Sequence, residues 1–155
     1  MMNDRPELLE ESSHLIKVRA FMMAAGQNLG EPHEVPPLQD RRRQAELIAE
    51  EAGELIGGLG FSITYNLDES EEGFDLVEAI DGALDLRVVS TGVLAMIGLP
   101  DVYLQEIVDE NNLGKFGPGH SWDTNGKLLK PPRHQPPAIA QAIEEITLQQ
   151  EGGSQ

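Results

Sequence analysis

Two clusters of acidic residues are the groups in this sequence that could carry out chemistry. Their members recur at helical intervals, first Glu50, Glu51 and Glu54, then Glu78, Asp81 and Asp85. If both segments are helices, residues three or four apart share one face, so the carboxylates of each segment point the same way. A hard divalent cation such as Mg²⁺ prefers oxygen donors of this kind and is often shared with substrate phosphates. The spacing therefore suggests a divalent-metal site for phosphate chemistry.

The distribution of charge also points to a bound cation. The chain has 155 residues, with 11 Lys and Arg against 27 Asp and Glu, and a formal net charge of −16. Between Arg43 and Arg87 there are twelve acidic residues and no basic one. Ordinary surface helices mix the two signs, because like charges one turn apart destabilise a helix. This segment lacks its own counter-charge, although a solvated acidic face remains the alternative.

The composition excludes several classes of function. So negative a chain disfavours nonspecific binding to DNA or RNA. Without cysteine there can be no disulfide, thiolate metal site or cysteine nucleophile. No apolar run is long enough for a signal peptide or a transmembrane helix, so we expect a cytoplasmic protein. The sequence also lacks a P-loop, so any phosphates must be held by side chains and metal.

Apolar periodicity, glycine and proline predict an all-α fold that positions the two acidic clusters. The expected helices are 7–26, 41–59, 74–97, 101–112 and 138–149, with Asp40 as the cap of the second. Residues 61–67 are β-branched and aromatic, but no second strand is available, so we expect an extended connection. Residues 114–137 are rich in glycine and proline and are expected to lack regular elements. The carboxylates therefore fall on the second and third helices.

The order and spacing of these motifs resemble a known signature. Glu-Glu-x-x-Glu at 50–54, followed 24 residues later by Glu-x-x-Asp at 78–81, resembles the metal-binding core of the MazG-like all-α nucleoside triphosphate pyrophosphohydrolases. Asn112 with Lys115, and Lys127 with Lys130, resemble later motifs of the phage and bacterial branch. The resemblance covers about residues 15–137. It implies a four-to-five-helix MazG-like bundle over 1–137 with an extended Gly/Pro-rich tail, and a C-terminal helix with a flexible end over 138–155.

The resemblance also implies a role for each motif residue. The implied metal ligands are Glu51, Glu54, Glu78 and Asp81. Glu50 is a further ligand or, with Glu51, a catalytic group that orients or deprotonates the attacking water. Asp85 lies at the rim, near the sugar or a third metal. The implied substrate-binding residues, which neutralise the triphosphate or contact the nucleotide, are Asn112, Lys115, Lys127 and Lys130.

The implied activity is conversion of a (d)NTP to the (d)NMP and pyrophosphate, with two or three Mg²⁺ or Mn²⁺ ions per site. By analogy with phage enzymes that act on guanine nucleotides, (d)GTP is placed first, and a phage-encoded chain would work in the host cytoplasm. A homo-oligomer is expected, either a tetramer built as a dimer of dimers or a dimer. The sequence departs from the branch at Val88, where tyrosine is common, which leaves base and sugar selection open.

Alternatives remain open at this point. The whole chain could instead be a non-enzymatic acidic helical protein, for example an inhibitor that mimics DNA and docks to a basic partner. Arg41, Arg42 and Arg43 could reach phosphates in a neighbouring subunit, offset nearby acids, or do both. Trp122 could stack on a base or anchor the tail, and we favour the anchor. The histidines share no metal-ligand spacing and are expected in loops or on the surface; they are His14, His33, His120 and His134.

Overall fold

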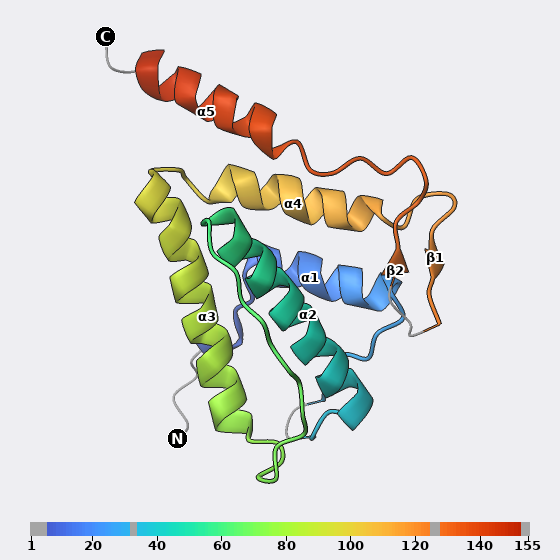
Figure 1. Cartoon of the computed structure of the whole chain (residues 1–155). Helices are drawn as coiled ribbons and strands as arrows, with labels where there is room; N and C mark the ends of the chain where they lie inside the picture. The colour runs from blue at the N-terminus through green and yellow to red at the C-terminus, as the bar shows by residue number, and fades with distance from the viewer. Residues whose placement is uncertain (1–5, 32–33, 125–127, 153–155) are drawn as a thin grey trace. The chain divides into compact units, whose positions relative to one another are not determined.

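The computed structural model describes residues 6–31, 34–124 and 128–152. The described chain is mostly helical, with five α-helices (Figure 1). Its elements in order are η1 (Pro6–Leu9), α1 (Ser13–Ala24), α2 (Leu38–Gly58), α3 (Leu76–Ile97), α4 (Val102–Gly114), β1 (Ser121–Trp122), β2 (Leu128–Leu129) and α5 (Ile139–Gly152). None of the helices described has the length and apolar character needed to cross a membrane. The helical prediction is confirmed.

The chain divides into two compact units. One unit comprises Met1–Leu29 with Arg87–Gln155, and the other comprises Gly30–Leu86. Helix α3 begins in the second unit and ends in the first. The second unit therefore contains α2, the connection after it and the start of α3, which are the segments that carry both acidic clusters.

The first unit is held together by helix packing around α4. Helix α4 packs against α1 and against α5 (Figure 1). Its apolar core comprises Leu104, Ala142 and Ile146, which are buried, with Leu94, Leu99 and Ile107 packed against them. Burying such side chains is the main favourable contribution to folding, so the α4–α5 contact stabilises this unit.

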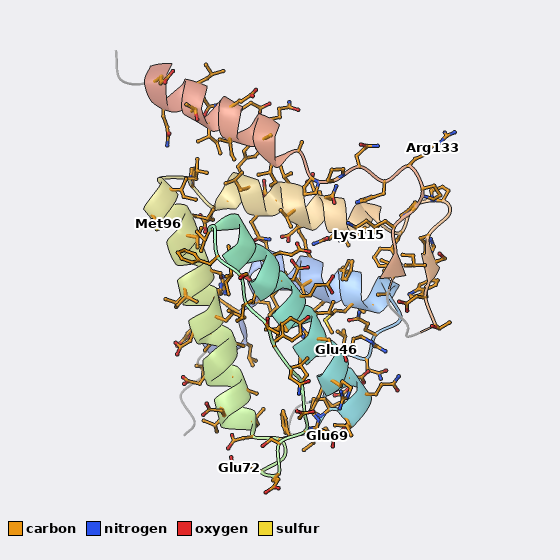
Figure 2. All side chains as sticks on the ribbon, in the orientation of Figure 1. Glu46, Glu69, Glu72, Met96, Lys115 and Arg133 are labelled. Atoms are coloured by element: carbon orange, nitrogen blue, oxygen red, sulfur yellow. The ribbon has the colours of Figure 1, made fainter. Side chains whose placement is uncertain are left out.

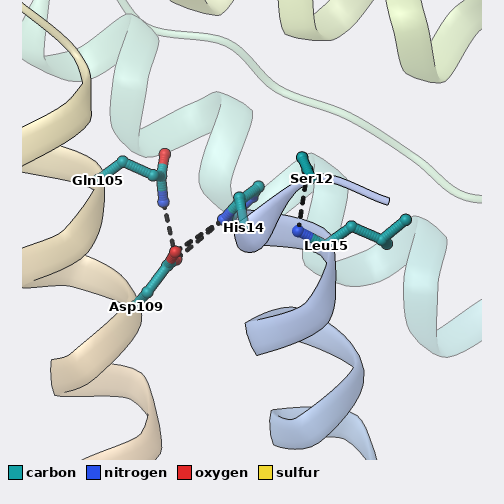
Figure 3. A network of polar contacts seen from close by, with 5 residues as sticks. All are labelled: Ser12, His14, Leu15, Gln105 and Asp109. Carbon is teal, nitrogen blue, oxygen red and sulfur yellow. Dashed lines mark hydrogen bonds and ion pairs between the residues drawn. The ribbon is translucent and has the colours of Figure 1, made fainter. Parts of the chain in front are cut away.

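A buried carboxylate joins α1 to α4 in the same unit (Figure 3). Asp109 is only 6% exposed, and its carboxylate accepts hydrogen bonds from His14 Nδ1 at 3.0 Å and from Gln105 Nε2 at 2.9 Å. A buried charge is tolerated only when donors replace the water that it loses. His14 therefore has a structural role that its sequence context does not reveal, because Asp109 lies 95 residues away.

The start of α1 differs from the prediction of a single helix over 7–26. A 3₁₀ turn occupies Pro6–Leu9, and the helix begins only at Ser13. The reason is local, because the Ser12 hydroxyl accepts a hydrogen bond from the Leu15 backbone N–H at 3.1 Å and caps the helix there.

Residues 114–137, rich in glycine and proline, were expected to lack regular elements. The expectation is wrong at two short segments, which form strands. Strands β1 and β2 pair antiparallel, Ser121 with Leu129 and Trp122 with Leu128. The chain after β2 is fastened to α4 by Asn111, whose amide donates to Gln135 O at 2.8 Å and whose Oδ1 accepts from His134 Nε2 at 3.0 Å. The many glycines and prolines of this stretch therefore do not prevent strand pairing.

In the second unit, the connection after α2 folds back along that helix. Ile63 Cγ2 lies 3.9 Å from where a Cβ on Gly53 would be, an ordinary van der Waals distance, so the extended segment packs on α2 at this point. Residues 61–67 form no strand, as predicted. The prediction that Asp40 caps α2 is wrong, because the helix begins at Leu38, after Pro37. Asp40 lies in the first turn, where its Oδ1 is 3.5 Å from Arg43 Nη1.

Candidate functional site

All six predicted carboxylates lie on helices of the second unit. Glu50, Glu51 and Glu54 are on α2, and the others are on the part of α3 that precedes Arg87. Because both segments are helical, Glu51 and Glu54 share a face, and so do Glu78 and Asp81. Asp75 fixes the start of α3, since its Oδ1 accepts from the Glu78 backbone N–H at 3.0 Å. The helical placement of both motifs is as expected.

The carboxylates of α2 and α3 are not gathered into one cluster in this structure. All six side chains are exposed. Among the described residues, α2 and α3 make no close backbone contact, and no three Asp, Glu or His side chains are arranged to hold a metal ion. The donor set still fits Mg²⁺ or Mn²⁺ chemically, because every member is a hard oxygen ligand open to solvent. The metal-ligand assignment therefore stays a prediction.

A pocket of about 280 Å³ lies beside the start of α2 in the same unit. Its lining includes Arg41, Arg42, Asp68, Glu69 and Ser70, and none of the six predicted carboxylates. The pocket combines two guanidinium groups with two carboxylates, so its charges are balanced internally.

The three consecutive arginines have partners close by. Arg41 Nε donates to Pro36 O at 3.0 Å, and its guanidinium carbon lies 5.3 Å from the ring centroid of Phe74. Arg42 Nη2 lies 3.5 Å from Glu69 Oε1. With the Arg43–Asp40 pair, these contacts favour the structural interpretation, in which the arginines offset local acids and fasten the connection to α2. Exposed ion pairs of this length contribute little stability, about 0–1 kcal/mol each.

The predicted phosphate-binding residues lie in the first unit. Lys115 follows α4, and its Nζ donates to Asn112 Oδ1 at 2.6 Å. Lys130 directly follows β2 and is exposed. Lys127 lies outside the described residues. Asn112 and Lys115 are thus in direct contact, and their role in binding phosphate stays a prediction.

A row of aromatic rings extends from α1 to β1 in the same unit. Phe21 and Phe116 have ring centroids 5.3 Å apart, Phe116 and His120 are 5.9 Å apart, and His120 and Trp122 are 4.9 Å apart, all edge to face. Lys115 Nζ lies 5.9 Å from the Phe21 centroid. These contacts support the interpretation of Trp122 as an anchor, while its side chain is still 46% exposed.

Tyr103 and Glu145 form a second polar link that sequence reasoning missed. The Tyr103 hydroxyl donates to Glu145 Oε2 at 2.8 Å, and Gln141 Nε2 donates to Oε1 at 2.9 Å. The hydrogen bond from Tyr103, followed by that from Gln141, lowers the pKa of Glu145 below its ordinary value. The same contact raises the pKa of Tyr103. The two residues face a pocket of about 460 Å³ between α4 and α5.

Comparison with known proteins identifies the fold. The chain superimposes on the crystal structure of a provisionally assigned NTP pyrophosphohydrolase from Exiguobacterium sp. 255-15 with a TM-score of 0.65 and 21% sequence identity. The match covers 94% of this chain and 100% of the other. The chain has a MazG-like fold. No protein-family model matches it, and no curated protein sequence does either.

The match covers nearly the whole chain, so it includes α2 and α3 with their acidic motifs. The side chains of these helices and of the connection between them, including Glu46, Glu69 and Glu72, are drawn in Figure 2.

Proposed function

We propose that this chain is a divalent-metal-dependent nucleoside triphosphate pyrophosphohydrolase that converts a (d)NTP to the (d)NMP and pyrophosphate. The observation that carries the proposal is the pair of acidic motifs, in family order and spacing, on α2 and α3 of a chain with a MazG-like fold. The similar protein from Exiguobacterium is itself provisionally assigned as an NTP pyrophosphohydrolase, which supports the same class of reaction.

In this proposal Glu51, Glu54, Glu78 and Asp81 hold Mg²⁺ or Mn²⁺. A cation bound there would offset the charge of the incoming triphosphate and of the leaving pyrophosphate. Glu50 and Glu51 orient the attacking water or accept its proton, and Asp85 contacts the sugar or a further ion. The exposure of these side chains supports the assignment, because a substrate can reach them without unfolding either helix.

The cationic residues of the first unit are proposed to bind the triphosphate. Lys115, Lys127 and Lys130 supply positive charge to the phosphates, and Asn112 contacts them or the nucleotide. The direct Lys115–Asn112 hydrogen bond supports a shared role, because it holds the ammonium group in place before substrate arrives. We propose (d)GTP as the first substrate to assay, by analogy alone.

We also propose that the protein is a homo-oligomer, a dimer or a tetramer. The support is the apolar surface of the second unit. No described residue of Gly30–Leu86 is buried, and Val77, Ile80 and Leu84 on α3 are 76%, 53% and 57% exposed. Apolar faces of this extent are characteristic of surfaces that become covered by another chain.

A product assay tests the proposed function. The protein is incubated with each (d)NTP and Mg²⁺, and pyrophosphate and orthophosphate are measured separately. Pyrophosphate with the nucleoside monophosphate is the expected pair of products, and the fastest substrate identifies the preferred base. Orthophosphate alone would assign the chain to a different class of hydrolase. No turnover with any nucleotide would favour the non-enzymatic acidic interaction protein, which needs no divalent metal.

A further inference from the structure

Trp122 on β1 contacts neighbouring aromatic rings, but these rings leave it exposed. His120 meets Trp122 edge to face, and Phe116 and Phe21 continue the row back to α1. His120 is itself fixed, because its Nδ1 donates to Gly117 O at 3.1 Å. An anchor needs only the buried part of the ring. The remaining 46% of Trp122 faces solvent, so a rigidly held indole is available to a ligand.

Charge and strand register place a cation on the same face of the ribbon as that indole. Residues 112–137 contain Lys115, Lys127, Lys130 and Arg133 but only one acid, Asp123, in a chain of net charge −16. Trp122 pairs with Leu128, and the register continued by one residue sets Lys130 opposite His120. Because side chains alternate between faces, His120, Trp122, Leu128 and Lys130 belong to one face of the two-stranded ribbon.

An indole and an ammonium group on one face of a ribbon match a nucleotide. The base of every nucleotide offers a flat π face that stacks on an aromatic side chain. The phosphates of the nucleotide attract a lysine. A nucleic-acid polymer is disfavoured, since the rest of the chain is strongly acidic and repels a long phosphate backbone. A single nucleotide carries only a few phosphates, so this repulsion opposes its binding far less.

We propose that Trp122 binds the base of a nucleotide by stacking, with Lys130 on the same face attracting its phosphates. This inference rests on the proposed function for the choice of nucleotide, and it adds a base-binding residue that the acidic motifs do not supply. Stacking is tolerant of base identity, so Trp122 contributes affinity for a base in general.

The experiment uses the fact that Trp122 is the only tryptophan in the chain. Intrinsic emission of the full-length protein therefore reports on this one side chain. It is titrated, with Mg²⁺ present, with deoxynucleoside triphosphates that carry a methylene group between the α and β phosphorus atoms, so that they bind without being cleaved. Inorganic tripolyphosphate serves as the ligand that lacks a base. Saturable quenching by the nucleotides and not by tripolyphosphate is expected.

Variants separate stacking from a purely structural role. Trp122→Leu should weaken nucleotide binding, measured by calorimetry, about five- to thirty-fold, the lower part of the range for stacking of a base on an aromatic ring. Trp122→Phe should restore most of the affinity, because phenylalanine retains a π face. Tyr65→Leu removes an aromatic residue of similar exposure, 50%, in the other unit and should leave both affinity and quenching unchanged.

The outcomes distinguish this inference from the proposed activity. Pyrophosphate release without nucleotide quenching, or with unchanged affinity in Trp122→Leu, would overturn the base site and leave the activity intact. Quenching without pyrophosphate release would support the base site and overturn the activity. If Trp122→Leu does not fold, emission of the unmodified protein and the affinity of Trp122→Phe still decide. Absence of nucleotide binding would overturn the base site whatever the turnover.

Discussion

At the scale of single residues, the proposed activity depends on the carboxylates of Glu51, Glu54, Glu78 and Asp81. Removing one of them should lower activity far more than removing another acid. Loss of a group that merely orients a metal ligand already costs about 10–100-fold in activity or metal affinity. Loss of a direct ligand should therefore cost about 100-fold or more. The backbone of α2 and α3 does not depend on these exposed side chains, so folding should survive.

We predict that Glu51→Gln and Asp81→Asn each lower kcat/KM for pyrophosphate release at least about 100-fold with unchanged circular dichroism. Glu72→Gln is the matched control, because it also removes one charge from an exposed acid, in the connection before α3 (Figure 2). Its activity should stay near that of the unmodified protein. Equal, small effects of all three substitutions on kcat/KM would contradict the assignment of Glu51 and Asp81 as metal ligands.

A second prediction concerns the pH dependence of the Tyr103–Glu145 contact. The pKa of Glu145 is lowered from its ordinary value of 4.5 chiefly by the Tyr103 hydroxyl. A lowered folded-state pKa contributes stability above 4.5 that is lost as the pH falls through that pKa. Tyr103→Phe should therefore raise the pKa of Glu145, measured by carboxyl ¹³C NMR, and its destabilisation should shrink in acid. An unchanged Glu145 pKa would contradict this assignment.

At high pH the stability contributed by the same contact depends on pH in the opposite direction. The pKa of Tyr103 is raised above its ordinary value of 10.0, chiefly by its hydrogen bond to Glu145. Its contribution is present below pH 10.0 and is lost as the pH rises through the folded-state pKa. The contact therefore stabilises the α4–α5 pair most between these two limits.

At the scale of elements, two glycines of α3 show that position in a helix decides how a substitution changes stability. One glycine follows the last residue of the helix and the other lies within it. Gly98 has φ of +83°, and its N–H donates to Leu94 O at 2.9 Å where the helix ends. Gly92 lies within the helix, and a Cβ there would meet nothing within 4 Å. Gly98 therefore adopts the left-handed conformation that ends the helix, whereas Gly92 only weakens the helix.

We predict opposite changes in the free energy of unfolding for two glycine substitutions. Gly98→Ala should lower it by about 1–2 kcal/mol, because alanine is strained at positive φ. Gly92→Ala should raise it by about 0.5–1 kcal/mol, because alanine loses less backbone entropy in a helix. Urea denaturation of both variants measures the two values. Changes of the same sign would show that the end of α3 is not formed as described.

The helices were predictable from sequence because their apolar and acidic residues recur locally. The predicted helix over 41–59 corresponds to Leu38–Gly58, and that over 74–97 corresponds to Leu76–Ile97. Contacts between distant residues were not predictable. Nothing near His14 points to Asp109, and nothing near Asn111 points to Gln135. The pairing of β1 with β2 was missed because each strand has only two residues, too few for any periodicity.

The candidate site was predictable in its residues and not in its assembly. Helical spacing places Glu51 with Glu54 and Glu78 with Asp81, and the structure has both pairs on helices as expected. Spacing along one helix says nothing about how two helices approach each other, which depends on side-chain packing and on bound ions. Convergence of the two pairs therefore remains a prediction.

At the scale of the whole molecule, the exposed apolar residues of α3 predict self-association. We expect more than one chain per particle by size-exclusion chromatography with light scattering, because covering such side chains is worth about 25 cal/mol per Å² of apolar surface. Ile80→Glu should shift the particle toward a single chain, since a charge cannot be buried unpaired at low cost. A monomer at high protein concentration would contradict the proposed oligomer.

The most direct test of the central claim is a crystal structure of the protein grown with Mn²⁺ and a non-cleavable deoxynucleoside triphosphate. We predict anomalous density for Mn²⁺ coordinated by carboxylate oxygens of Glu51, Glu54, Glu78 and Asp81 and by phosphate oxygens. Those four side chains pointing to separate regions of solvent, with Mn²⁺ absent or bound elsewhere, would contradict the account.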